Sequence, residues 1–208
     1  TDSPKFQGTK TNVAFDATTN TLNLVGGGNF DDITDFDAVG SLDDFGGIVS
    51  EGTYDFGGTA GGDTLDLGGV FSLDLKRHFL TEGFYPSDLF DSRGLIDDIT
   101  DFDGATATEV NAEMLVRVTQ DNPSGSPTYS NFQTFANGTY KGRGFQFRAK
   151  LTSNDVAQDI KVSQLGYTAS LQRRTEQGNV IASGAGAKAV TFTNPFFVGT
   201  SSLLGANT

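Results

Sequence analysis

Short segments in which apolar and polar residues alternate recur along this chain, and each is typical of a half-buried β-strand. In the clearest case Phe71, Leu73 and Leu75 share one face, with polar residues between them. In another, Phe145 and Phe147 alternate with polar residues, which marks both rings as core. The pattern predicts about nine strands at short spacing. The main ones are 10–16, 21–25, 52–56, 70–76, 113–119, 145–151 and 165–171.

Turn signals separate these segments. The run 121–127 (D-N-P-S-G-S-P) holds two prolines and a glycine, and 16–20 (D-A-T-T-N) is turn-like. Asn137-Gly138 is a strong hairpin signal. An antiparallel sheet fits because alternating strands need cover on one face only. With almost no helical periodicity, the sequence predicts an all-β fold, an antiparallel β-sandwich.

Changes in composition divide the chain. Residues 1–50 contain the first strands and a loop rich in glycine and aspartate, and we expect them to belong to the sandwich. The core of the sandwich is expected at 51–172. Residues 173–189, charged and then rich in glycine and alanine, have the composition of a linker. Residues 187–208 begin a second small β unit or form an arm for assembly.

Composition and charge limit the possible functions. Glycine occurs 27 times, which suits many turns, and the absence of cysteine excludes disulfides and thiolate metal sites. The formal net charge of −12 argues against a nucleic-acid partner and against adsorption to an anionic membrane. Since no apolar run is long enough to span a bilayer, we expect no membrane insertion.

Several spaced motifs resemble a module of tailed-phage tail proteins of the tail-tip attachment and host-specificity type. They cover a little over half of the chain, and Thr191 to Phe196 is similar to the start of a small sandwich that often follows this module. The motifs are Gly52-Thr53-Tyr54-Asp55-Phe56, Asp66-Leu67-Gly68, Asn111-Ala112-Glu113, Arg117-Val118-Thr119, Asp121-Asn122-Pro123-Ser124-Gly125-Ser126-Pro127, Arg143-Gly144-Phe145-Gln146-Phe147-Arg148-Ala149, Leu151-Thr152-Ser153-Asn154-Asp155 and Asp159-Ile160.

The resemblance implies a jelly roll similar to galactose-binding-like domains, with a C-terminal extension, in the tail of a virion. It also implies a homo-oligomer, a trimer or a hexamer, which contacts itself and other tail proteins and is assembled in the host cytoplasm. The chain departs from the usual pattern at two positions. Tyr129 stands where the aromatic residue is often tryptophan, and Gly144 stands where alanine is more typical.

A candidate ligand site consists of Arg117, Tyr129, Gln146 and Arg148. The two arginines and the glutamine lie on the polar faces of their predicted strands. Planar guanidinium groups bind sugar hydroxyls or carboxylates in a bidentate manner, so the expected ligand is a glycan on the host surface. A second interpretation is that the arginines pair with Glu113 or other acids across the sheet.

The heptad D-D-I-T-D-F-D occurs twice, at 31–37 and at 97–103. Closely spaced carboxylates in a loop suit calcium, and the candidate ligands are Asp97, Asp98, Asp101 and Asp103. The segment does not fit an EF-hand, because Ile99 and Val110 occupy positions where ligands are needed. One hypothesis is a structural calcium of another type, and the other is that the aspartates cap turns. No other cofactor is expected.

Catalytic signals are weak. His78 is the single histidine, no G-x-S-x-G elbow accompanies it, and a half-exposed histidine beside Lys76 and Arg77 at a strand end is the simpler interpretation. We therefore expect no enzyme, but a structural component of a virion tail that contributes to host attachment by binding glycan. The alternative is a free carbohydrate-binding module or a glycan-degrading tail enzyme. An enzyme would show two carboxylates facing each other across a groove.

Overall fold

The computed structural model describes residues 6–26, 47–57, 63–85, 107–156, 158–171 and 184–186. Within these ranges the chain forms a nine-stranded sheet and no helix. The strands are β1 (Thr9–Thr11), β2 (Val13–Asp16), β3 (Thr21–Leu24), β4 (Glu51–Asp55), β5 (Leu65–Phe84), β6 (Val110–Thr119), β7 (Gln133–Thr134), β8 (Gly138–Ser153) and β9 (Asp159–Leu171). Every pairing between them is antiparallel, so the predicted all-β antiparallel fold is confirmed.

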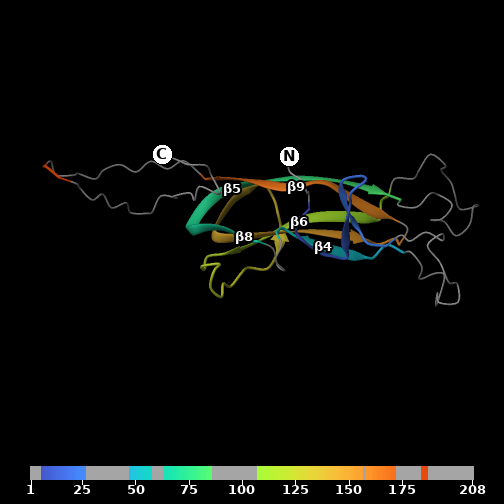
Figure 1. Cartoon of the computed structure of the whole chain (residues 1–208), viewed down its shortest axis with the longest axis horizontal. Helices are drawn as coiled ribbons and strands as arrows, with labels where there is room; N and C mark the ends of the chain where they lie inside the picture. Colours follow the sequence, from blue (N-terminus) through green and yellow to red (C-terminus); the bar gives the residue numbers. More distant parts are fainter. Residues whose placement is uncertain are drawn as a thin grey trace, which may run out of the picture.

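β8 organises the sheet. β6 pairs with 144–153 of β8, while on the opposite edge β4 pairs with 148–152 and β5 with 138–145. The complete path of neighbours is β1-β4-β8-β5-β9-β3-β2, with β7 beside β6. Figure 1 shows β5 and β9 on one side of the molecule and β8 and β4 on the other. The curled sheet therefore encloses a core, as a sandwich or a nearly closed barrel does.

Two clusters of buried side chains fill this interior. Phe145 and Phe147 on β8 are buried, as the alternation predicts, and Phe147 stacks on Tyr167 with ring centroids 3.9 Å apart. Phe56 and Phe79 contact both clusters and join them. One cluster contains Leu67, Leu73, Leu75, Met114, Val116, Phe135, Phe145 and Phe147. The other contains Val13, Leu22, Leu24, Ile48, Tyr54, Ala149, Leu151, Ile160 and Val162.

A corner at Asn12 nearly closes the sheet. The alternation predicts one strand at 10–16, but β1 pairs with β4 and β2 pairs with β3, at opposite ends of the strand order. Asn12 makes the bend with a φ of 55°, a left-handed conformation that asparagine tolerates better than most residues. The Asn12 carbonyl accepts a hydrogen bond from the Val25 amide (3.1 Å), and its Nδ2 donates to the Glu51 carbonyl (3.2 Å).

The contact between β3 and β9 depends on a buried carboxylate. In the ladder itself, Leu22 pairs with Val162. Next to this pair, Asp159 is 2% exposed, and its Oδ1 accepts hydrogen bonds from the amides of Leu24 (3.1 Å) and Ile160 (2.6 Å). Burial raises the pKa of Asp159 to about 6, although these two amides and Lys161 act in the opposite direction. A titratable group is therefore buried at the point where β9 meets β3.

The structure corrects one more sequence prediction, and several others concern residues outside the described ranges. β5 extends to Phe84, so His78 lies within a long strand and not at a strand end as expected. Its Nε2 lies 2.8 Å from Oγ1 of Thr168 on β9. Apart from 184–186, the predicted linker 173–189 lies outside the described residues, as do the C-terminal unit at 187–208 and most of the glycine- and aspartate-rich loop, 27–46.

Candidate functional site

The structure brings the four candidate ligand residues together on the outer face of β6 and β8. Arg117 and Gln146 are cross-strand partners, and Arg117 Nε donates a 2.7 Å hydrogen bond to Gln146 Oε1. Arg148 follows two positions along β8, on the same face as Gln146. Tyr129 reaches this face from the segment between β6 and β7, and Arg117 lies over its ring at 4.9 Å from the centroid.

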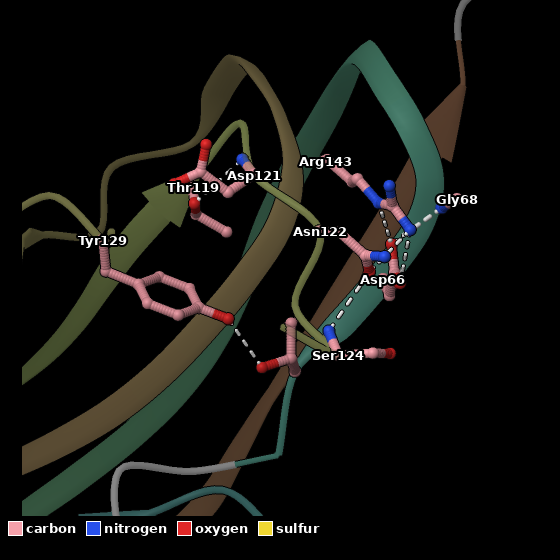
Figure 2. A network of polar contacts seen from close by, with 9 residues as sticks. Asp66, Gly68, Thr119, Asp121, Asn122, Ser124, Tyr129 and Arg143 are labelled. Carbon is pink, nitrogen blue, oxygen red and sulfur yellow. Dashed lines mark hydrogen bonds and ion pairs between the residues drawn. The ribbon is translucent and has the colours of Figure 1, made fainter. Parts of the chain in front are cut away.

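A chain of hydrogen bonds ties Tyr129 to the sheet. The Tyr129 hydroxyl lies 2.8 Å from Oγ1 of Thr64, just before β5, and Gln146 Nε2 donates to the same oxygen at 2.9 Å. Figure 2 shows the Tyr129 ring with its hydroxyl at the end of this contact. Gln146 is 8% exposed, because the segment between β6 and β7 that contains Tyr129 lies over it. Thr64 carries no signal in the sequence that would have predicted this role.

Phe132 completes the cluster and was missed by the sequence analysis. The guanidinium of Arg117 lies 4.6 Å from the centroid of its ring, and that of Arg148 lies 4.5 Å away. Such stacking of guanidinium groups on an aromatic ring is attractive. The sequence offered no clear signal for this contact, because residues three positions apart in an extended segment are expected on opposite faces.

Arg148 forms an ion pair with an acid on a neighbouring strand. Its Nε and one Nη donate to the two carboxylate oxygens of Asp55 on β4, at 2.6 and 2.9 Å. The hydrogen bond that Arg148 donates to this carboxylate is the main cause that raises the pKa of Arg148, against a smaller opposing effect of burial. The interpretation that the arginines pair with acids across the sheet is therefore correct for Arg148. Its partner is Asp55 and not Glu113.

The loop 120–132 is fixed at its base. Thr119 is buried and its hydroxyl donates to the Thr128 carbonyl (2.8 Å). The same hydroxyl accepts from the Asp121 amide (3.1 Å), and the Asp121 carboxylate accepts from the Thr128 amide (2.8 Å). Further along, the amide of Ser130 donates to the Val118 carbonyl (2.9 Å). The loop thus returns along the end of β6.

A second network fixes the outer part of the loop. Figure 2 shows Arg143 in contact with both Asp66 and Asn122. Arg143 Nε donates to Asp66 Oδ1 (3.1 Å), and one Nη donates to Asn122 Oδ1 (2.9 Å). Partial burial acts to raise the pKa of Asp66, but hydrogen bonds from Arg143 and from the Gly68 amide outweigh it and lower the pKa. Asn122 also accepts from the Ser124 amide (3.1 Å), so the turn is held by its own side chain.

Gly144 allows the loop to approach the sheet. A Cβ at this position would lie 2.8 Å from Pro123 Cγ, 2.8 Å from Thr119 Cγ2 and 3.1 Å from Thr64 Cγ2. The absence of a side chain at Gly144 therefore permits the tight packing of Pro123 against β8.

Polar side chains from several separate segments of the chain meet in this region. These side chains bond to one another or to neighbouring residues of the same segments. They are Asp55, Asp66, Arg117, Asn122, Arg143 and Arg148. Their polar side chains thus hold strands and loop in place. At the tip of the loop, Ser124, Gly125 and Ser126 are exposed.

The candidate calcium ligands Asp97, Asp98, Asp101 and Asp103 lie outside the described residues, as does the first heptad at 31–37. In the described part of the chain, no group of three or more histidine, aspartate or glutamate side chains is arranged to hold a metal ion. A helix able to cross a membrane is likewise absent from that part.

Comparison with protein-family models, with curated proteins and with solved structures finds no match to this chain.

Proposed function

We propose that this chain is a non-catalytic module of a virion tail, and that it contributes to host attachment by binding cell-surface glycan through the loop 120–132. The observation that supports this function is that an exposed polar loop is fixed both at its base and in its outer part. Loops that are already ordered before binding lose less conformational entropy when a ligand arrives. Hydroxyl, amide and aromatic groups on a rigid support suit the many hydroxyls of a sugar.

The geometry also favours a binding role for the loop tip more than it favours a binding role for the arginines. The guanidinium of Arg148 is bonded to Asp55 and stacked on Phe132, and that of Arg117 lies against both Tyr129 and Phe132. We therefore place the four candidate residues, Arg117, Tyr129, Gln146 and Arg148, in the support of the site and the exposed serines in contact with ligand. The virion tail, the oligomer of three or six copies and contacts with other tail proteins complete the proposal.

The test is binding of the labelled full-length protein to a panel of bacterial cells and to their extracted surface polysaccharides. Ser126→Arg places a long charged side chain at the loop tip and should reduce binding at least tenfold. Ser170→Arg is the matched control, since Ser170 is an exposed serine on β9, and it should bind as the unchanged protein does.

Saturable binding that Ser126→Arg removes and Ser170→Arg retains supports the proposal. Binding that both variants retain would move the contact away from the loop. Absence of binding by folded protein to every member of the panel would contradict the attachment role and leave a purely structural tail component. A release of reducing sugar from the polysaccharides during the assay would instead identify the alternative, a glycan-degrading enzyme.

A further inference from the structure

We propose that β1 is an exchangeable strand, which in an assembly leaves its own sheet and pairs with β4 of a second copy of this chain. The proposal does not rest on the attachment function, because it concerns how copies join. It starts from the position of β1, which is continuous with β2 through Asn12 although the two strands pair with β4 and β3 at opposite ends of the strand order.

Asn12 is the hinge on which the proposal depends. Asn12 has a φ of 55° in the closed form, which is unfavourable for a residue with a side chain. Asn12 is the single residue between β1 and β2, so an extended Asn12 would join them into one continuous strand. Short, strained hinges of this kind favour exchange of identical elements between copies.

The surface that would receive β1 is already defined in a single copy. Residues of β1 pair with β4 at three positions, from Thr9 with Asp55 to Thr11 with Thr53. The Gly8 amide donates to the Tyr54 hydroxyl (2.8 Å), and the Phe6 ring lies against Tyr54 with centroids 5.8 Å apart. A second copy offers the same groups, so exchange would preserve these contacts and change the hinge.

Contacts at the corner oppose exchange. The hydrogen bonds of Asn12 to Val25 and Glu51 hold the closed form. Gly52 permits this closeness, because a Cβ there would lie 2.6 Å from the Asn12 carbonyl oxygen. The balance between hinge strain and these bonds sets the ratio of closed to exchanged chains, and association adds an entropic cost that falls at high local concentration, as in an assembly.

The test uses a disulfide that reports which copy supplies β1. The chain has no cysteine, and Thr11 and Thr53 are direct cross-strand partners, so Thr11→Cys with Thr53→Cys should form a disulfide. The full-length double variant is combined with Asn12→Val, which disfavours the left-handed hinge, or with Asn12→Gly, which accepts it. Each protein is refolded over a range of concentrations, oxidised and separated on a non-reducing gel.

We expect the ratio of inter-chain to intra-chain disulfide to rise with concentration in the double variant. It should be about tenfold higher with Asn12→Val than with Asn12→Gly, a factor that corresponds to the cost of the left-handed conformation. Exclusively intra-chain disulfides at every concentration in all three proteins would overturn the proposal. If Asn12→Val fails to fold, the concentration series with the unchanged hinge decides the question by itself.

Discussion

Arg148 on β8 donates two hydrogen bonds to Asp55 on β4, and the Asp55 side chain is 8% exposed while that of Arg148 is 28% exposed. Removing one partner of a buried ion pair leaves the other charge without compensation, and that is more costly than the pair itself is stabilising. Asp55→Ala should therefore lower the free energy of unfolding by about 2–4 kcal/mol, measured by urea denaturation.

The matched control joins the same two strands. Lys150 and Glu51 form a 2.8 Å ion pair whose side chains are 36% and 55% exposed. Exposed pairs contribute little because water screens them, so Glu51→Ala should change the free energy of unfolding by less than about 1 kcal/mol. Equal losses in the two variants would contradict the special role of the buried pair.

Asp159 should make stability depend on pH. Its pKa is about 6 in the folded protein against an ordinary 3.8, so the folded state binds this proton more tightly than the unfolded chain does. The stabilising contribution is complete below about pH 4 and is lost as the pH rises through about 6. The loss is at most about 3 kcal/mol.

Asp159→Asn keeps an oxygen that can accept from the Leu24 amide but carries no charge. Relative to the unchanged protein, the variant should therefore gain stability between pH 4 and pH 7. Urea denaturation of both proteins at a series of pH values measures this difference. Parallel profiles would show that the carboxylate does not titrate in this interval.

Gly144→Ala should displace the loop. A Cβ there lies too close to Pro123 and Thr119, and overpacking of this kind costs about 1–3 kcal/mol. Gly166→Ala on β9 is the control, because no atom lies within 4 Å of the added Cβ. Thermal melts should show a clear loss for the first variant and little change for the second. A Gly144→Ala protein as stable as the control would argue against the packing of Pro123 on β8.

Phe132→Leu keeps apolar bulk but removes the ring that stacks on Arg117 and Arg148. Each stacking contact contributes about 0.5–1 kcal/mol at a partly exposed site, so the variant should lose about 1–2 kcal/mol. The loop should also become easier to cleave by protease under native conditions. An unchanged rate of cleavage, with the fold intact, would show that the loop is fixed by its backbone hydrogen bonds instead.

Calcium separates the two hypotheses for the aspartate heptads. If Asp97, Asp98, Asp101 and Asp103 bind a structural calcium, millimolar calcium should raise the melting temperature and EDTA should reverse the effect. Asp97→Asn with Asp101→Asn should then abolish the response. A melting temperature that calcium leaves unchanged supports turn capping by the aspartates.

Much of the fold follows from the period of two in the sequence. The alternation around Leu73 and Phe147 predicts both the strands and their buried faces, because one face must be covered. The corner at Asn12 was not predicted, because 10–16 was interpreted as one strand and the bend depends on which distant strands pair with β1 and β2. The full length of β5 was missed for a similar reason, because its end pairs with β9 over residues that do not alternate clearly.

The candidate site was predicted in part. Period and polarity place Arg117, Gln146 and Arg148 on one outer face, and the structure does bring them together with Tyr129. The sequence could not show that Asp55 and Phe132 engage the arginines, because these contacts join residues from separate segments of the chain. A local pattern identifies the face of a strand, and only the tertiary structure shows which partner reaches it.

The pairing of β3 with β9 also has a consequence for the order of synthesis. The amide of Leu24 and the carboxylate of Asp159 are 135 positions apart. At ribosomal rates of about 5–20 residues per second, the first strands must wait roughly seven to twenty-seven seconds for the last one to emerge. During that interval the edge of β3 that pairs with β9 in the folded protein lacks its partner strand.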